Sequence, residues 1–264
     1  YLSQAAEIAH TRNLKTLSAA LRNDLGIVLA LQGRFPEALA AFQDSAAGAT
    51  EENVRILFVR TRVNAARVAM QLKRFDEAAA ALNEADDRLA ATAVSHNKAD
   101  GLINLALGYR DLATVQPDEH ARWLKRSAAL LQEAAAMAEE SGGKRLASYA
   151  YGHLGHLYEE ERRLDEALQL TRRAVFAAQS AGAPESLYRW QWQSGRLLTR
   201  LGSLDGALSA YQEAAATLQP IRAEVASGSQ ASLDPAHQSL RSLYFELADL
   251  LLQPKVFLLV QAFP

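Results

Sequence analysis

Small and apolar residues recur along this chain in a pattern that predicts pairs of amphipathic helices. The clearest pair lies in residues 148–181, SYAYGHLGHLYEEERRLDEALQLTRRAVFAAQSA. In its first helix, Tyr151, Leu154, Gly155 and Tyr158 follow the three-to-four residue spacing that places them on one face. Gly155 leaves a notch in that face where a neighbouring helix can approach closely.

The pattern repeats with a period of about 40 residues. With Gly155 as the anchor, the anchors are Gly26, Ala66, Ala106, Gly155, Gly195 and Ala248, at intervals of 40, 40, 49, 40 and 53 residues. In four pairs an alanine follows twelve residues later, at Ala38, Ala78, Ala167 and Ala207. A bulky residue often comes four further on, at Phe42, Leu82 and Tyr211, and Thr171 departs from this rule. The chain is therefore expected to be a repeat protein.

The predicted fold is all-α, an α-solenoid of antiparallel helix pairs. We expect helices at 1–12, 14–33, 35–48, 51–73, 75–92, 96–114, 119–141, a pair within 148–181, and helices at 184–202, 204–226 and 236–253. The third pair carries an insertion, a turn at 116–119 and extra helix around Trp123. Repeat arrays are quasi-one-dimensional, so one array over residues 1–253 is expected, with a half repeat at each end and an apolar tail at 254–264.

The repeat resembles the tetratricopeptide repeat, a helix–turn–helix unit. The residues that carry the likeness are ALRNDLGIVLALQGRFPEALAAF (20–42), AYGHLGHLYEEERRLDEAL (150–168) and QWQSGRLLTRLGSLDGALSAY (191–211). The period of about 40 exceeds the usual 34, which resembles the longer-period class of these repeats. Residues 101–113, 151–198 and 243–252 also resemble the repeat region that precedes CHAT, or caspase-like, protease domains in bacterial proteins. That resemblance implies a sensor part, because the chain has no cysteine to serve as the protease nucleophile.

Composition changes this picture little. The formal net charge of −2 gives no bulk attraction to nucleic acid or to an anionic membrane surface. The absence of cysteine excludes disulfides and thiol catalysis, and it fits a reducing compartment such as the cytoplasm. The chain begins without methionine, and residues 1–12 read as the second helix of a repeat, so a fragment is expected. The tail 254–264 is too short to span a membrane and either covers the last helix or pairs with another molecule.

A partner is expected to bind along the first helices, which line the concave side of such a superhelix. Two residues before each anchor the chain reads Asp24, Asn64, Asn104, His153 and Gln193. Neutral amides and imidazoles both donate and accept hydrogen bonds, so this ladder could hold the backbone of an extended peptide. The alternatives are a solvated polar face and amides that bond to the adjacent repeat.

Charged and aromatic residues extend this predicted groove. The arginines are Arg60, Arg67, Arg110, Arg189, Arg196 and Arg200, and acids such as Asp111 and Glu159 lie between them. Guanidinium groups match carboxylates, so a partner with acidic groups is one hypothesis, and ion pairs within the groove are the other. Trp192 either faces the groove or packs against the last repeat, whereas Trp123 and Trp190 are expected to pack.

Nothing in the sequence favours catalysis. His153 and His156 lie three apart on a helix with Glu159 and Glu160, but they lack the HExxH pattern and a further ligand. No cofactor or metal is expected, and we predict a non-enzymatic protein-interaction scaffold or sensor that binds a peptide or protein partner. The alternative is a structural module that self-associates, or docks onto a separate effector domain, through its end helices.

Overall fold

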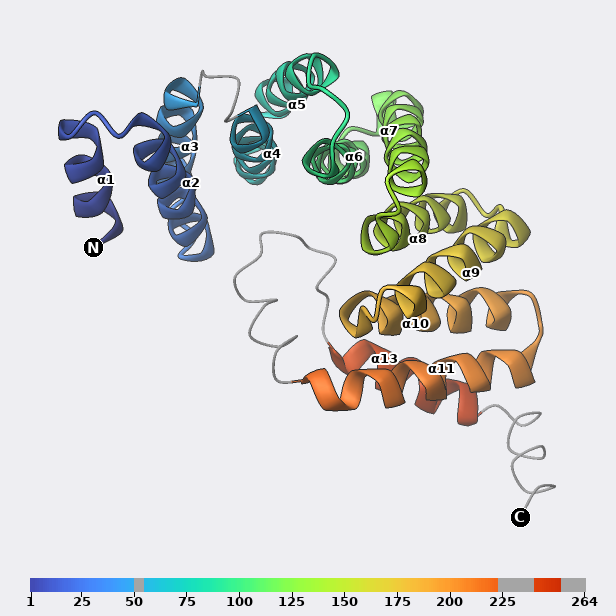
Figure 1. Cartoon of the computed structure of the whole chain (residues 1–264). Helices are drawn as coiled ribbons and strands as arrows, with labels where there is room; N and C mark the ends of the chain where they lie inside the picture. The colour runs from blue at the N-terminus through green and yellow to red at the C-terminus, as the bar shows by residue number, and fades with distance from the viewer. Residues whose placement is uncertain (50–54, 223–239, 253–264) are drawn as a thin grey trace. The chain divides into compact units, whose positions relative to one another are not determined.

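The computed structural model describes residues 1–49, 55–222 and 240–252, and every regular element in these ranges is helical. The contacts form two compact units, one ending at Met137 and the other starting at Ala138. The first contains α1 (Leu2–Thr11), α2 (Lys15–Leu31), α3 (Phe35–Gly48), α4 (Arg55–Gln71), α5 (Phe75–Ala90), α6 (His96–Val115), the short 3-10 turn η2 (Pro117–Glu119) and most of α7 (His120–Glu140) (Figure 1). The second contains α8 (Lys144–Glu160), α9 (Leu164–Ser180), α10 (Pro184–Arg200), α11 (Leu204–Leu218), η3 (Gln219–Ile221) and α13 (Leu240–Leu251).

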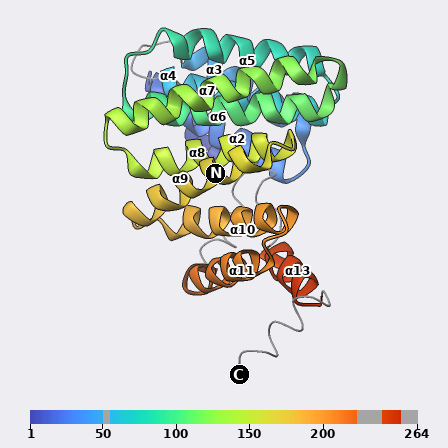
Figure 2. The same ribbon diagram turned by 90° about the vertical axis from the view of Figure 1, so that its right-hand side faces the viewer.

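The predicted all-α fold is confirmed, and most ends of the described helices lie within a few residues of the predicted positions. The helix predicted at 204–226 is shorter, because α11 ends at Leu218 and the 3-10 turn η3 follows it. Consecutive helices pack in antiparallel pairs: α2 on α3 and α4 on α5 in the first unit, α8 on α9 and α10 on α11 in the second. Figure 2 shows α8, α9, α10 and α11 following one another, with α13 beside α11. A single array over 1–253 stays a prediction. The predictions for the tail 254–264 and for the loop at 227–235 lie outside the described residues.

The first helix of a pair ends at one repeated position, seven residues after the anchor. Gly33, Lys73, Arg162 and Gly202 all have φ between 59° and 80°. In each case the next residue donates its N–H to the carbonyl five residues earlier, as Arg163 does to Tyr158 at 2.9 Å. This 6→1 hydrogen bond satisfies a carbonyl that the helix end leaves open. The position requires a left-handed backbone, but it is glycine only at Gly33 and Gly202. A search for glycine in the sequence therefore misses the same helix end at Lys73 and Arg162.

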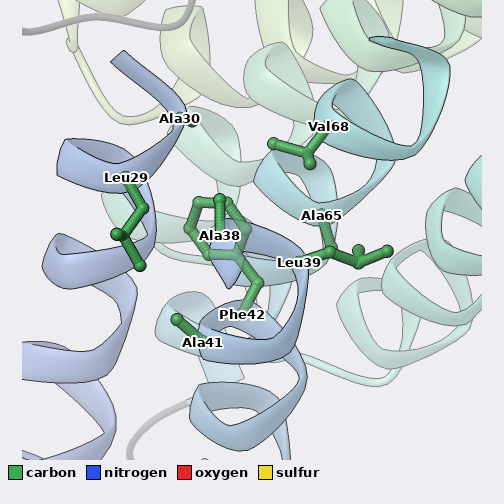
Figure 3. Close-up of a cluster of buried hydrophobic side chains, with 8 residues drawn as sticks. All are labelled: Leu29, Ala30, Ala38, Leu39, Ala41, Phe42, Ala65 and Val68. Carbon is green, nitrogen blue, oxygen red and sulfur yellow. The ribbon is translucent and has the colours of Figure 1, made fainter. Parts of the chain in front are cut away.

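The anchor residues make room for a ring from the second helix of the same pair. A Cβ on Gly26 would lie 2.6 Å from a ring carbon of Phe42, and one on Gly195 would lie 2.8 Å from Tyr211. Figure 3 shows Phe42 among Leu29, Ala30, Ala38, Leu39, Ala41, Ala65 and Val68. The predicted notch is therefore real, and the side chain sixteen residues after the anchor fills it.

The second unit departs from this rule at Thr171, and a polar side chain fills the space instead. The Gln193 amide donates to the Thr171 hydroxyl at 2.7 Å and to the Gly152 carbonyl at 3.1 Å. Gln193 is only 2% exposed. An amide in a buried site needs partners for its donors, and these two bonds supply them. Trp123 and Trp190 are each 4% exposed, so their predicted packing role is confirmed.

Candidate functional site

The predicted groove residues lie on the first helices of the pairs, α2, α4 and α6 in the first unit and α8 and α10 in the second. They do not form one continuous row of accessible side chains. Some are buried in bonds to the preceding repeat, some form ion pairs, and some remain at the surface. Each unit carries its own set of candidate residues.

Asn64 belongs to a buried polar network between two repeats of the first unit. Its Nδ2 donates to Oδ1 of Asn23 at 3.2 Å, and Asn64 is 7% exposed. The same Asn23 oxygen accepts from the Thr61 hydroxyl at 3.2 Å, and Thr61 lies 3.1 Å from the Ser45 hydroxyl. Asn23, Ser45 and Thr61 are fully buried. The network ties α4 to α2 and α3 and leaves the Asn64 amide little access to a partner.

The ladder positions of the second unit are also engaged internally. Gln193 fills the notch at Thr171, and His153 is 6% exposed and meets the Trp190 ring edge-on at a centroid distance of 5.1 Å. The alternative of amides that bond to the adjacent repeat therefore describes Asn64 and Gln193. The reason is geometric, since this position lies at the edge where one first helix meets the preceding pair.

Two ladder positions remain accessible in the first unit. Asp24 is exposed, and Asn104 is partly exposed. The Asn104 Nδ2 donates to the backbone carbonyl of Asp100 at 3.0 Å, within its own helix. Arg60 is exposed on α4. These side chains are free of the constraint that buries Asn64, so they are the first-unit residues that a partner could reach.

The other two predicted groove arginines of the first unit, Arg67 and Arg110, both contact the carboxylate of Asp111. The Arg67 Nε lies 3.1 Å from Oδ2 of Asp111, and the side chains of both are 13% exposed. Arg110 reaches Oδ1 of the same carboxylate at 3.4 Å. The pair joins α4 to α6, which agrees with the alternative of ion pairs within the groove. One carboxylate with two guanidinium groups leaves a positive excess at this place.

In the second unit, Glu159 is the centre of the charged face. The Arg196 guanidinium contacts it twice, Nε to Oε1 at 3.2 Å and Nη2 to Oε2 at 3.1 Å. Arg200 reaches Oε1 at 3.3 Å, and His156 reaches Oε2 at 3.3 Å. Burial of the Glu159 side chain, 4% exposed, opposes its ionisation, but the hydrogen bonds and charges of His156 and Arg196 outweigh that effect and lower its pKa to about 2. Glu159 is thus a carboxylate held ionised by Arg196 from the next repeat and by a hydrogen bond from His156 on its own helix.

Trp192 continues this cluster toward the end of the unit. Its Nε1 donates to Oε2 of Glu246 on α13 at 2.7 Å, and the Arg196 guanidinium lies over its ring at 5.2 Å. The Tyr211 hydroxyl donates to the same Glu246 oxygen at 3.0 Å. Trp192 therefore packs against the last repeat while one face of its ring supports Arg196. Arg189, also predicted for the groove, is partly buried beside the Tyr188 ring.

Sequence reasoning named Glu159 only as one acid among several, although it contacts more of the charged face than any predicted arginine. The positions of Glu159 and Arg196 relative to the repeat anchors could have predicted their contact. Glu159 lies four residues after one anchor and Arg196 one residue after the next, so the two face each other across neighbouring first helices.

No group of three His, Cys, Asp or Glu side chains that could bind a metal occurs in the described residues. None of the described helices is long and apolar enough to cross a membrane.

Comparison with known proteins finds one family match within the chain. Residues 59–88, which include most of α4 and α5, match the tetratricopeptide repeat model. This segment is therefore similar to a tetratricopeptide repeat. No curated protein sequence matches the chain. The wider likeness comes from solved structures that share 10–18% identity with the chain, so the likeness concerns the fold.

BtubC (BKLC) from P. vanneervenii aligns over 84% of this chain and 88% of its own, with 18% identity and a TM-score of 0.66. A signal transduction ATPase with a tetratricopeptide repeat sensor from Pyrococcus horikoshii aligns with 90% of this chain at 10% identity and a TM-score of 0.59. Aspartyl phosphate phosphatase F from Bacillus subtilis aligns with 93% at 16% identity and a TM-score of 0.59. This chain spans only 36% of the ATPase and 63% of the phosphatase. These helical-repeat neighbours agree with the predicted solenoid class.

Proposed function

We propose that this chain is a non-catalytic interaction module that binds a protein or an extended peptide over the charged faces of its first helices. The observation that carries the proposal is the Arg196–Glu159 contact. A guanidinium has five N–H donors, and this contact uses only two of them. Glu159 thus fixes Arg196 in one orientation while donors remain for another carboxylate, and preorganised arginines lose little entropy on binding. This favours a partner with acidic groups.

The first unit supplies a second, smaller set of accessible groups, Arg60, Asp24 and Asn104. The buried amides Asn64 and Gln193 are not part of the proposed contact surface. Their role in the proposal is to hold neighbouring first helices in register. The sensor hypothesis draws support from the Pyrococcus horikoshii ATPase, in which a tetratricopeptide repeat part is described as the sensor. A CHAT-type effector and a cytoplasmic location stay predictions from the sequence.

The test replaces exposed arginines on these faces. We expect Arg200→Glu, alone and with Arg60→Glu, to release proteins that co-purify with the wild-type chain, because both changes put a negative charge where an acidic partner would bind. The matched control is Arg172→Glu, an exposed arginine on α9, the second helix of its pair. Circular dichroism verifies that all variants keep their helicity. If the same proteins stay bound to all variants, the first-helix faces are not the binding surface.

The alternative, self-association through the end helices, has its own observation. On α13, Phe245 is 67% exposed, and Leu252, the residue that follows the end of the helix, is 77% exposed. On α1, Ile8 is 55% exposed. If this face pairs copies of the chain, analytical ultracentrifugation will show a concentration-dependent dimer that Phe245→Glu abolishes. A wild-type chain that stays monomeric at about 100 μM would argue against self-association. A dissociation constant of that size corresponds to a binding free energy of only roughly 5 kcal/mol.

A further inference from the structure

The side of α13 that carries its anchor residue is exposed. Ala248, the sixth anchor of the repeat, is exposed, whereas the five earlier anchors are buried. Phe245, three residues before it, is 67% exposed, and Leu252, four residues after it, is 77% exposed. Leu252 follows the end of α13, but its N–H donates to the Ala248 carbonyl at 3.0 Å, which continues the helical spacing. Residues three and four apart lie on one side of a helix, so these side chains form one apolar surface, the α13 face.

In the other first helices, the positions that make up this face are covered by neighbouring helices. The notch at the Gly26 anchor is filled by the Phe42 ring from the second helix of the same pair. Trp192, three residues before its anchor, contacts the following first helix, α13. Ala30, four residues after its anchor, lies in one buried cluster with Val68 of the following first helix, α4 (Figure 3). The α13 face therefore corresponds to a surface that a second helix and a following repeat cover elsewhere in the chain.

A complementary apolar surface lies on α2. Leu14, Leu17, Val28 and Leu31 are 38–50% exposed. Leu14 directly precedes α2, and the other three residues lie within it. With about 100° of rotation per residue, the four positions fall within about 100° of one another around the helix. They form one apolar side of α2, the α2 face.

The residues equivalent to Val28 in later first helices are buried against the preceding pair. Val28 lies two residues after its anchor, as do Val68 in α4 and Leu197 in α10. Val68 is buried in one cluster with Phe42 of α3, and Leu197 is buried in one cluster with Ala167 of α9. Val28 is 38% exposed. Among the described residues, α2 packs on α1, α3 and α4, and no first helix of an earlier pair covers the α2 face.

The neighbouring helix α1 has the position of a second helix. It packs on α2 as α3 packs on α4 and as α9 packs on α10. Leu2 lies 24 residues before the Gly26 anchor, which is the interval that separates Phe42 from the Ala66 anchor. Phe42 fills the notch at the anchor of its own pair. A first helix beside α1 would therefore set its anchor against Leu2 and cover the α2 face.

We propose that α13 of one copy of the chain packs against α1 and α2 of a second copy, so that copies associate head to tail. Ala248 would lie against Leu2, and Leu252 would lie against Val28 in the same relation as Ala30 to Val68 within the chain. A second copy fits this place because each face supplies what the other lacks. The α13 face belongs to a first helix with no following repeat on it, and the α2 face lacks a preceding first helix.

This pairing specifies the self-association alternative and does not depend on the proposed groove. Its two surfaces differ, so it is a heterologous contact. Each copy in a pair keeps one free face, and assembly therefore continues past the dimer or closes into a ring. A symmetric contact between two α13 faces would stop at the dimer instead.

Two substitutions disable one face each, Phe245→Glu the α13 face and Val28→Glu the α2 face. Both residues are exposed in a single copy, so circular dichroism should show unchanged helicity. A carboxylate at either place would be buried without a partner in the contact, which should weaken association at least about tenfold. Leu17→Glu is a second variant of the α2 face. The matched control is Phe176→Glu, which replaces an apolar side chain that is 68% exposed on α9, outside both faces.

The measurement is sedimentation velocity at about 100 μM chain, for each protein alone and for an equimolar mixture of the Phe245→Glu and Val28→Glu variants. We expect the wild type and Phe176→Glu to assemble, and each face variant alone to sediment as a monomer. The mixture should form a 1:1 dimer and grow no further, because one variant keeps its α2 face and the other keeps its α13 face.

Three results would each overturn the proposal. A monomeric wild type would show that the α13 face is not a contact between copies. Assembly of Val28→Glu and Leu17→Glu alone would indicate symmetric pairing of α13 faces. A mixture that stays monomeric while the wild type assembles would exclude head-to-tail pairing. Arg200→Glu, which tests the proposed groove, should assemble as the wild type does, so the failure of one proposal is distinguishable from the failure of the other.

Discussion

The ionised Glu159 side chain should make the second unit sensitive to acid, and replacing it with glutamine should remove that sensitivity. Its pKa falls from the ordinary 4.5 to about 2 in the folded chain. A group with a depressed folded pKa stabilises the fold above its unfolded pKa, and this contribution is lost as pH falls toward the folded pKa. A difference of about 2.5 units corresponds to roughly 3 kcal/mol near pH 6, of which about 1 kcal/mol remains at pH 3.

The assay is urea unfolding of wild type and Glu159→Gln at several pH values from 3 to 7, with circular dichroism and tryptophan fluorescence as readouts. Two of the three tryptophans, Trp190 and Trp192, lie in the second unit. We expect the difference between the two proteins to shrink by about 2 kcal/mol between pH 6 and pH 3. Two optical probes are needed because repeat proteins do not always unfold in one step.

The control is Glu160→Gln, which removes a neighbouring glutamate whose side chain is 38% exposed and whose Oε1 lies 3.4 Å from Nε2 of His156. Exposed pairs contribute about 0–1 kcal/mol, so this variant should follow the wild type at every pH. A Glu159→Gln variant that is as stable as wild type at pH 6, or a difference that does not change with pH, would refute the account of Glu159 as a carboxylate held ionised by Arg196 and His156.

Four further substitutions test how the repeats pack. Gly195→Ala would place a Cβ 2.8 Å from the Tyr211 ring and should lower the free energy of unfolding by about 1–3 kcal/mol in urea titrations, and no loss would show that the ring shifts freely. Gln193→Leu should cost about 1–3 kcal/mol because it removes the amide that donates to the buried Thr171 oxygen, which then keeps only its own donation to the Ala167 carbonyl, whereas Asn104→Ala at the surface should cost less than about 0.5 kcal/mol. Arg162→Gly, at φ 60°, should raise the melting temperature, since the residue change relieves about 1 kcal/mol of left-handed backbone strain, and a lower melting temperature would contradict this.

The sequence was sufficient to predict the architecture because the same residue pattern recurs in several helix pairs. Anchors, second-helix alanines and helix breaks recur at a fixed spacing, so an error in one pair is corrected by the others. Trp123 and Trp190 could be assigned to the interior in the same way, and the turn at 116–119 was visible from its proline and acidic residues. These features depend on neighbours within one helix pair, which sequence spacing describes well.

The availability of each polar side chain was decided by tertiary structure. Asn64 and Asn104 occupy the same register, yet the first is buried against Asn23 and the second stays at the surface, because the facing residue of the preceding repeat differs. Gln193 is buried because Thr171 is too small to fill the notch at Gly155. Glu159 became the centre of a charged face because the next first helix brings Arg196 and Arg200 to it. Register determines which face a residue lies on, but its partners across neighbouring helices determine whether it remains free to bind another molecule.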